Sequence, residues 1–275
     1  MMKPDLKRDA VKLISNIAGT FSRHLTLRSS HNFPLIHIPE KPFADMSNNG
    51  VVFDNTVASE INVTRLRHLK SLGIPLTGKS VLDVGCGVGH LSQFFVQEGC
   101  KVLALDARLE NIQALQKLYP QIDARVWNIE SEGLGQFGHF DIVFCYGLLY
   151  HLENLVTPLR QMASVCRETL LIETIITDSV LPINRVVDET PHVNQALGAI
   201  GHRPTPNYLV WLLERFGFRN VYTPTSPPDH PDFHFKWKNN FDYMRNGHNL
   251  RCIFIASKQP IANPKLVSLL PPSCP

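Results

Sequence analysis

Short apolar runs alternate with amphipathic segments from about residue 55 to residue 176. The runs, of which Ser80–Val84 is one, contain few polar residues, as expected of buried strands. In the segments between them, apolar residues recur every three or four positions, as on one face of an α-helix. This alternation predicts an α/β fold with a mostly parallel sheet and crossover helices.

The expected elements follow this alternation along the chain. They are a helix over Asn55–Leu72, a strand over Ser80–Val84, a helix over His90–Gln97, a strand over Lys101–Leu105, a helix over Leu109–Leu118, strands over Ala124–Ile129 and Asp141–Tyr146, a helix over Thr157–Cys166 and a strand over Thr169–Ile176.

After residue 176 the alternation stops. Residues 178–206 contain several prolines and show no clear periodicity, which predicts an insertion or lid. The stretch "TPNYLVWLLERFGF" predicts a helix, with Pro206 near its first turn and Gly217 as its end. Val221–Thr223 and Arg251–Ala256 are expected to be the closing strands of the sheet.

The chain is therefore expected to have three parts. These are an N-terminal extension over residues 1–50 with a basic amphipathic helix at Asp5–Arg28, a main domain over 51–258 with insertions at 178–206 and 224–246, and a mobile or surface-draped tail over 259–275.

The clearest chemical signal is the stretch "VLDVGCGVGHL". Gly85, Gly87 and Gly89 follow a strand and open a helix, so the main chain can turn tightly and present backbone N–H groups to a ligand. A dinucleotide-binding turn would need glycine at position 90, where His90 stands. Asp83, just before the turn, would repel a pyrophosphate but suits an ammonium group.

A second aspartate, Asp106, closes the next strand, where a carboxylate can accept both hydroxyls of a ribose. A ribose joined to a positively charged amino-acid end, without phosphate, describes S-adenosylmethionine. An α/β protein whose glycine turn binds no ligand would explain the glycines but not the two aspartates.

From Val81 to about Glu173 the chain resembles the class I S-adenosylmethionine-dependent methyltransferases. "LDVGCGVGHLS" is similar to their first motif, "ALDAR" to their second, and "FDIVFCYGLLYHL" to their fourth strand and the turn after it. The resemblance implies a Rossmann-like sandwich with helices on both faces. It also implies a seven-stranded sheet in the order 3-2-1-4-5-7-6, with strand 7 antiparallel.

The resemblance also implies where the cofactor would bind. It assigns Asp83, Gly85 and Gly87 to the methionine end and Asp106 to the ribose. The adenine would lie against Asn128 and Ile129; many relatives have aspartate where Asn128 stands, but the asparagine amide oxygen can still meet the adenine amino group. Further contacts are expected from Cys86, Gly89, Ala107 and Cys145.

The turn after the fourth strand is where a catalytic group is expected, because ligands of open sheets lie beyond the carboxyl ends of the strands. His151 is the candidate general base, since an imidazole can accept a hydroxyl proton at neutral pH. The alternative is that His151 only braces the loop around an acceptor that is already nucleophilic. Tyr146 is expected to line the methionine or acceptor pocket. Tyr150, Glu173, His202 and Arg203 are candidate acceptor contacts.

No metal site is expected. His230 and His234 have the spacing of a helical metal pair, but the prolines around them argue against a helix. The six cysteines include no C-x-x-C pair, so neither zinc nor a disulfide framework is indicated.

The composition is that of an ordinary globular protein, with 44% hydrophobic and 19% charged residues. No run approaches the roughly eighteen apolar residues of a membrane span, and the first residues lack the pattern of a secretory signal. With no disulfide framework indicated, a reducing cytoplasm is the expected location, and the basic N-terminal helix leaves membrane-surface attachment or a homodimer contact open.

The favoured function is O-methylation of a small molecule, a glycan or a natural product. The motif after the fourth strand also resembles the tRNA wobble-uridine carboxymethyl transferases, so a tRNA-modifying enzyme is the alternative. The net charge of +3 supplies no broad basic face for tRNA, and no arginine can be assigned to a carboxymethyl donor. A cofactor-binding module without turnover is a third hypothesis, against which the two aspartates count.

Overall fold

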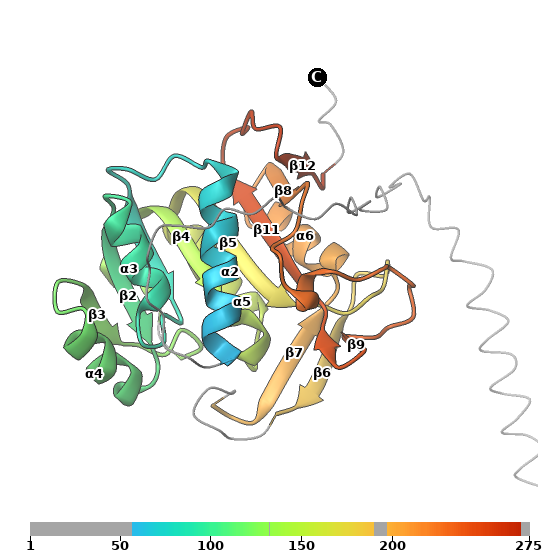
Figure 1. Ribbon diagram of the computed structural model, residues 1–275, viewed down its shortest axis with the longest axis horizontal. Coiled ribbons are helices and arrows are strands. Elements are labelled where there is room, and N and C mark those ends of the chain that lie inside the picture. The colour runs from blue at the N-terminus through green and yellow to red at the C-terminus, as the bar shows by residue number, and fades with distance from the viewer. Residues whose placement is uncertain (1–56, 132, 190–196, 271–275) are drawn as a thin grey trace, which may run out of the picture. The chain divides into compact units, whose positions relative to one another are not determined.

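The computed structural model describes residues 57–131, 133–189 and 197–270 (Figure 1). The basic helix expected over Asp5–Arg28 lies outside these residues, as does the rest of the N-terminal extension.

The elements up to residue 175 alternate as the sequence predicts. They are α2 (Val57–Leu72), β1 (Ser80–Val84), α3 (His90–Gln97), β2 (Lys101–Asp106), α4 (Leu109–Leu118), β3 (Asp123–Val126), η1 (Leu134–Phe137), β4 (Phe140–Tyr146), η2 (Leu149–His151), α5 (Val156–Val165) and β5 (Cys166–Ile175).

The remaining elements are mostly strands. They are β6 (Asn184–Asp188), β7 (Ile200–Pro204), α6 (Pro206–Arg215), β8 (Asn220–Pro224), η3 (Pro231–Phe233), β9 (Met244–Arg245), β10 (His248–Asn249), β11 (Arg251–Ser257) and β12 (Leu266–Ser268).

The central sheet has the order β12-β8-β11-β5-β4-β1-β2-β3. Without β12, this is the expected order 3-2-1-4-5-7-6, and β11 is antiparallel to both of its neighbours as expected of strand 7. The expected count of seven is wrong, because the tail supplies an eighth strand: Leu266–Ser268 pairs with the edge of β8, whose backbone groups would otherwise lack partners.

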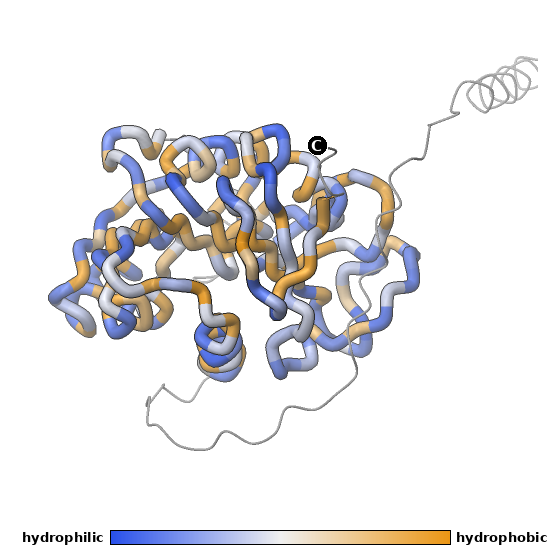
Figure 2. The backbone as a smooth tube through the Cα atoms, turned by 90° about the horizontal axis from the view of Figure 1, so that it is seen from above, coloured by the Kyte–Doolittle hydropathy of each residue, from blue (hydrophilic) through white to orange (hydrophobic). Residues whose placement is uncertain are grey.

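Helices cover both faces of the sheet. Apolar residues of α2 and α3 pack on one face with Val81 and Phe144, and those of α5 and α6 pack on the other with Leu82 and Val143. Figure 1 shows α2 and α3 in front of the sheet and α6 behind it, and in Figure 2 the hydrophobic colour concentrates in the strands. Strand β1 lies between β2 and β4 and is buried. Its carboxyl end is therefore in the middle of the row of strand ends, where the glycine turn begins.

The first insertion contains regular structure, contrary to the sequence prediction of a segment without periodic elements. β6 and β7 form an antiparallel two-stranded ribbon, with Val186 opposite His202. The ribbon packs against η2, the short turn that carries His151. Its strands have no clean alternation because β7 is buried along most of its length while β6 is largely exposed.

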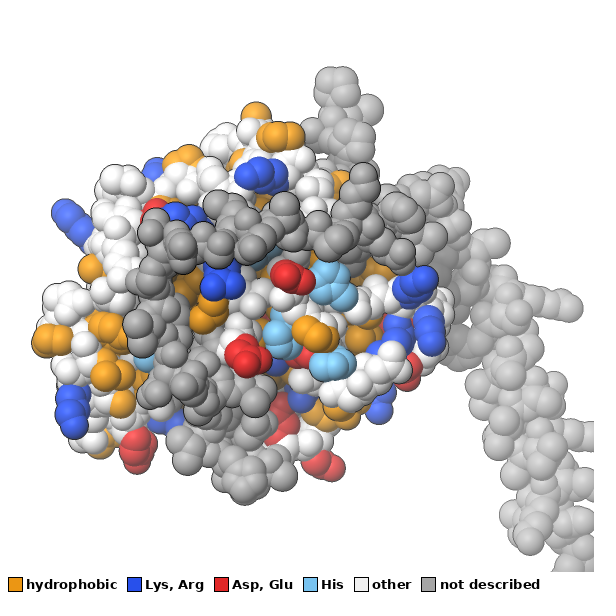
Figure 3. Space-filling view, viewed as in Figure 1, with side chains coloured by type: hydrophobic (Ala, Val, Ile, Leu, Met, Phe, Trp, Pro, Cys, Tyr) orange, Lys and Arg blue, Asp and Glu red, His pale blue; other side chains and the backbone are white. Residues whose placement is uncertain are grey.

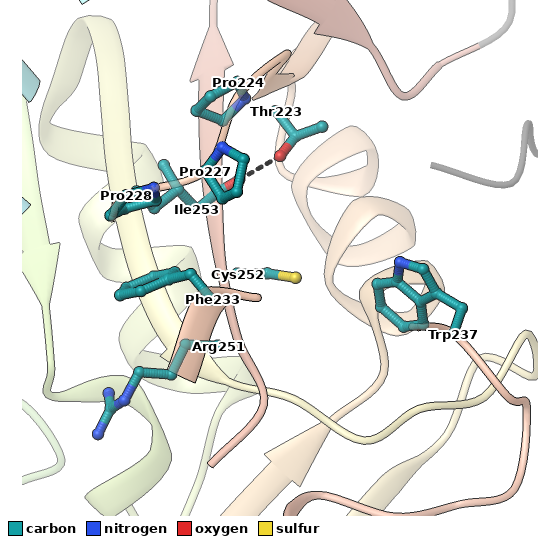
Figure 4. A pocket seen from close by; sticks show the side chains of 9 residues that line it. All are labelled: Thr223, Pro224, Pro227, Pro228, Phe233, Trp237, Arg251, Cys252 and Ile253. Carbon is teal, nitrogen blue, oxygen red and sulfur yellow. Dashed lines mark hydrogen bonds between the residues drawn. The ribbon is translucent and has the colours of Figure 1, made fainter. Parts of the chain in front are cut away.

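The second insertion covers a gap in the sheet. β8 pairs with β11 only near Ile255–Ser257, and further along, the Thr223 hydroxyl donates to the carbonyl of Ile253 at 2.9 Å. Figure 4 shows Pro227, Pro228 and Phe233 over this gap, with the Arg251 side chain turned away from Trp237. The resulting pocket is mainly apolar, so it acts as an extension of the core under the loop.

A buried aspartate fastens the same insertion to the end of β5. The Asp178 carboxylate accepts hydrogen bonds from the backbone N–H groups of Lys238 and Asn239 at 2.7 and 2.9 Å, and from Arg245 at 2.8 Å. Asp178 is almost fully buried, so these three donors replace its hydration.

An ion-pair network joins α2 to strands β5 and β11 of the sheet. The Glu173 carboxylate, at the end of β5, is fully buried and lies 2.6 Å from Arg65 of α2 and 3.0 Å from Arg251 of β11. Arg251 also donates to Asp232 at 2.9 Å and lies over the Tyr150 ring. These contacts connect α2, β5, β11, η2 and the second insertion at one edge of the sheet.

Removal of Arg251 should destabilise the fold. Arg251→Met leaves Asp232 without this cation and Glu173 with one arginine instead of two, so we expect the free energy of unfolding to fall by about 3 kcal/mol. Urea denaturation followed by circular dichroism measures this. Arg167→Met is the matched control, because Arg167 is likewise an arginine on a strand of the central sheet, β5, but is exposed; it should change stability by less than about 0.5 kcal/mol. Equal effects of the two variants would contradict the assignment.

Candidate functional site

The glycine turn joins β1 to α3 in a left-handed backbone conformation. Gly85, Gly87 and Gly89 all have positive φ, at 78°, 54° and 87°. A Cβ on Gly89 would lie 2.5 Å from the Leu115 side chain, so this position packs against α4. A Cβ on Gly87 would meet no atom within 4 Å among the described residues, so this side of the turn has room for a ligand.

Asp83 lies beneath the turn and is buried. Its carboxylate accepts a hydrogen bond from the Ser92 hydroxyl, in the first turn of α3, at 2.6 Å. Burial raises the pKa of Asp83 to about 7; the nearby Asp106 also raises it, while the Ser92 hydrogen bond opposes the shift. A carboxyl group in this position gains most from a cationic ligand, because such a ligand restores the charged form.

Asp106 has a second role that the sequence did not indicate. Its carboxylate accepts hydrogen bonds from the backbone N–H groups of Gly87 and Arg108, both at 2.9 Å, and from the Asn111 side chain at 3.0 Å. It therefore fixes the glycine turn to the end of β2 before any ribose is present. Cys86 and Ala107 lie in these same two turns, and the Cys86 N–H donates to the carbonyl of Leu105.

The segment expected to hold the adenine follows β3 directly. β3 ends at Val126, three residues earlier than expected, because Asn128 starts a turn in which its side-chain oxygen accepts from the backbone N–H of Glu130 at 3.0 Å. The Trp127 N–H donates to the carbonyl of Asp106, so this turn lies beside the residue that is predicted to bind the ribose. The Asn128 oxygen is thus already hydrogen-bonded, and Ile129 packs into the core.

The turn after β4 touches the glycine turn. A Cβ on Gly85 would lie 2.8 Å from the Cβ of Leu148, so the two turns are in close contact. Cys145 is fully buried and packs on the side of α5, which leaves only its backbone near the site. Tyr146 packs on the opposite face, stacked on Phe144, and its buried hydroxyl has no hydrogen-bond partner among the described residues.

His151 ends η2, three residues after Leu148. Its Nδ1 lies 2.6 Å from the carboxylate of Glu189, in the first insertion. Burial lowers the pKa of His151, and this effect is opposed by Glu189 and reinforced by Arg203 and Arg251. The imidazole is therefore neutral at neutral pH, which is the form that a general base requires.

Arginines hold the surroundings of His151 in place. Arg203 donates to Glu189 at 2.7 Å and to the carbonyl of Tyr150 at 2.9 Å. The guanidinium groups of Arg203 and Arg251 both lie over the Tyr150 ring. Arg203 and Tyr150, predicted as acceptor contacts, are thus brought next to the candidate base.

Two other predicted acceptor residues have mainly structural contacts. His202 Nε2 is 2.8 Å from the carbonyl of Glu153, and its Nδ1 contacts Asn184 across the ribbon. Glu173 is engaged by Arg65 and Arg251 and has no exposed surface. Their roles toward an acceptor remain predictions.

The sequence did not single out Ser92, Arg65, Arg251 or Glu189. Arg65 lies beside Gly147, whose Cβ would be 3.4 Å from its guanidinium. Ser92 could have been suspected, since a residue in the first turn of α3 must face the end of β1. Glu189 gave no signal, because it lies in a segment without periodicity.

Within residues 57–131, 133–189 and 197–270, no group of three or more histidine, cysteine or acidic side chains is arranged to hold a metal ion. No helix in the described part of the chain is long and apolar enough to cross a membrane.

The match to a domain family covers more of the chain than the matches to individual curated proteins. The methyltransferase domain family matches residues 60–223, which is more than half of the chain. The ubiquinone biosynthesis O-methyltransferase of Xanthomonas euvesicatoria pv. vesicatoria (strain 85-10) is 35% identical over 111 residues, or 39% of this chain and 46% of that protein. That of Escherichia coli O157:H7 is 32% identical over 112 residues, again 39% and 46%. The chain thus matches just under half the length of these curated relatives.

Solved structures share the fold at low identity. The N-terminal domain of EvdMO1 with SAH bound aligns with a TM-score of 0.58 and 17% identity, covering 77% of this chain and 91% of that domain. Magnesium protoporphyrin IX methyltransferase (ChlM) from Synechocystis PCC 6803 with bound SAM aligns with a TM-score of 0.50 and 17% identity, covering 76% and 87%. Since the family match spans most of the sheet and includes the glycine turn, the chain belongs to the methyltransferase domain family, a family that uses S-adenosylmethionine.

Proposed function

We propose that this protein transfers a methyl group from S-adenosylmethionine to a hydroxyl group of a small-molecule acceptor, with His151 as the general base. The observation that carries the proposal is a neutral, partly buried imidazole on the turn that contacts the glycine turn. The O-methyltransferase names of the curated relatives also support a hydroxyl acceptor.

The residues of the glycine turn fit the cofactor. Gly87 leaves room beside the backbone, Asp83 can balance an ammonium group, and Asp106 can accept ribose hydroxyls. Bound S-adenosylmethionine supplies a methyl group that is already activated by its sulfonium. The protein must therefore align the acceptor, exclude water and remove one proton.

In the proposed step, the acceptor hydroxyl gives its proton to Nε2 of His151. An oxygen electron pair forms the new bond to the methyl carbon as the carbon–sulfur bond breaks, and that bonding pair stays on sulfur. His151 then releases the proton to water. The Tyr146 hydroxyl, buried and without a partner among the described residues, is the candidate donor for orienting a polar group of the bound molecules.

A tRNA acceptor remains the alternative. A tRNA-binding enzyme needs a broad surface of one positive sign. On the face shown in Figure 3, basic and acidic side chains are interspersed, and the net charge is only +3. We therefore favour a small-molecule acceptor.

Substitution of Asp106 should weaken cofactor binding. Asp106→Asn keeps the size of the side chain but removes its charge and replaces one hydrogen-bond-accepting oxygen with an NH₂ donor. We therefore expect the Kd for S-adenosylhomocysteine to rise at least about tenfold. Isothermal titration calorimetry measures this. Asp123→Asn, at an exposed carboxylate of β3, is the control and should leave Kd unchanged. Failure of the folded wild-type protein, freed of copurified ligand, to bind either form of the cofactor would refute the proposal.

Cofactor binding should also depend on pH through Asp83. Its pKa of about 7 means that the carboxyl is mostly protonated below that pH and becomes a better partner for an ammonium group as pH rises. We expect affinity to increase several-fold between about pH 5.5 and pH 7.5, a range that ends before a typical α-amino group loses its proton. In Asp83→Asn the increase should vanish. A wild-type affinity that stays constant over this range would show that Asp83 does not face the ammonium group.

Substitution of His151 should lower turnover strongly without loss of cofactor binding. Transfer of a labelled methyl group to a panel of phenols, sugars and bulk tRNA would identify the acceptor. We expect His151→Ala to lower kcat by about 10²- to 10⁴-fold, while His139→Ala, at an exposed histidine, leaves it unchanged. Because burial lowers the pKa of His151, the wild-type rate should rise with pH, with the midpoint of the rise below the ordinary imidazole value of 6.5. An unaltered kcat in His151→Ala would reduce this residue to a structural role.

A further inference from the structure

The first insertion supplies a carboxylate to the candidate base. Glu189 directly follows β6, and His151 ends η2, 38 positions earlier in the chain. The Glu189 carboxylate lies 2.6 Å from Nδ1 of His151, and the two side chains are 3% and 15% exposed. This contact is short and shielded from water, so it is strong enough to govern the state of the imidazole.

The carboxylate is itself held from the other side. Its second oxygen accepts from Arg203 at 2.7 Å, and Arg203 also donates to the carbonyl of Tyr150, the residue next to His151. Arg203 is thus bound both to the carboxylate and to the backbone of the turn. Glu189 has little freedom to turn away from His151 as long as this arrangement persists.

The ribbon also leaves space for the carboxylate. A Cβ on Gly201, in β7, would lie only 2.4 Å from a Glu189 oxygen. Gly201 pairs with Val187 in β6, two residues before Glu189, so the absence of a side chain there lets the carboxylate cross over β7 toward η2.

We propose that Glu189 is a positioning residue for methyl transfer: it accepts a hydrogen bond from Nδ1–H of His151 and thereby keeps the lone pair on Nε2 for the acceptor proton. This inference rests on the proposed function, in which His151 is the base. When Nε2 takes the proton, the imidazolium charge is balanced by Glu189, while Arg203 keeps the carboxylate in place. The Ser-His-Asp triad is the general example of this logic.

The decisive variant is Glu189→Gln. Arg203 has only donors, so it should attract the amide oxygen of glutamine and leave the amide NH₂ facing His151. Nδ1 must then act as an acceptor, and the proton must move to Nε2. If the contact only tied the ribbon to η2, it would survive this change. If Glu189 fixes the tautomer of His151, the change should switch the imidazole from the Nδ1–H form to the Nε2–H form.

Nuclear magnetic resonance of ¹⁵N-histidine-labelled full-length protein tests this without any acceptor. Long-range ¹H–¹⁵N spectra distinguish the two neutral tautomers, and the signals of His151 are those lost in His151→Gln. We expect Nδ1–H in the wild type and in Asp188→Asn, a matched control at an exposed carboxylate one residue away, and Nε2–H in Glu189→Gln. The same tautomer in wild type and Glu189→Gln would overturn the inference.

Two further measurements separate this inference from the proposed function. With an acceptor in hand, Glu189→Gln should lower kcat about 10²-fold or more, with KM for S-adenosylmethionine unchanged. The predicted decrease of kcat in His151→Ala together with a normal kcat in Glu189→Gln would overturn the inference and leave the proposed function intact. If Glu189→Gln does not fold, Gly201→Ala, whose methyl group displaces the carboxylate, should give mixed tautomers; a single Nδ1–H form would count against the role of Glu189.

Discussion

The ion pairs of Glu173 are the constraint on which the functional edge of the sheet depends. The carboxylate has no exposed surface, so its charge must be balanced inside the protein. Arg65 approaches it from helix α2, and Arg251 approaches it from the neighbouring strand β11. Arg251 then reaches Asp232 and the Tyr150 ring, which joins the second insertion to the turn that carries His151. Since a buried charge tolerates little displacement, α2, β11 and η2 are fixed relative to the end of β5.

At the glycine turn, a single carboxylate likewise holds two segments together. The Asp106 carboxylate binds the N–H of Gly87 as well as groups of its own turn, so the ends of β1 and β2 form one unit. The close contact between Gly85 and Leu148 extends this unit to the end of β4. The turns proposed to bind the cofactor and the turn that carries the candidate base are therefore packed against one another.

The ribbon of β6 and β7 brings the first insertion against η2, the turn that carries His151. Glu189, directly after β6, lies against His151, and Arg203 of β7 binds Glu189 and the backbone of Tyr150. The pKa of His151 reflects this mixed environment: burial and two arginines lower it, while Glu189 raises it. An imidazole kept neutral yet firmly oriented is suited to proton removal, and the insertion provides the orientation.

The sequence determined the parts of this protein that depend on local pattern. Helix α3 and strand β1 begin and end where periodicity and the glycines predict. The cofactor was inferred from Asp83 at the end of β1, the glycine turn, and Asp106 at the end of the next strand, β2. Only the tertiary structure decided the rest. β12 exists because β8 offers an open edge, and Glu189 meets His151 because the ribbon folds back on η2. Such contacts join residues far apart in the chain, where no spacing rule applies, and they are selected by the burial of charge and of backbone groups instead.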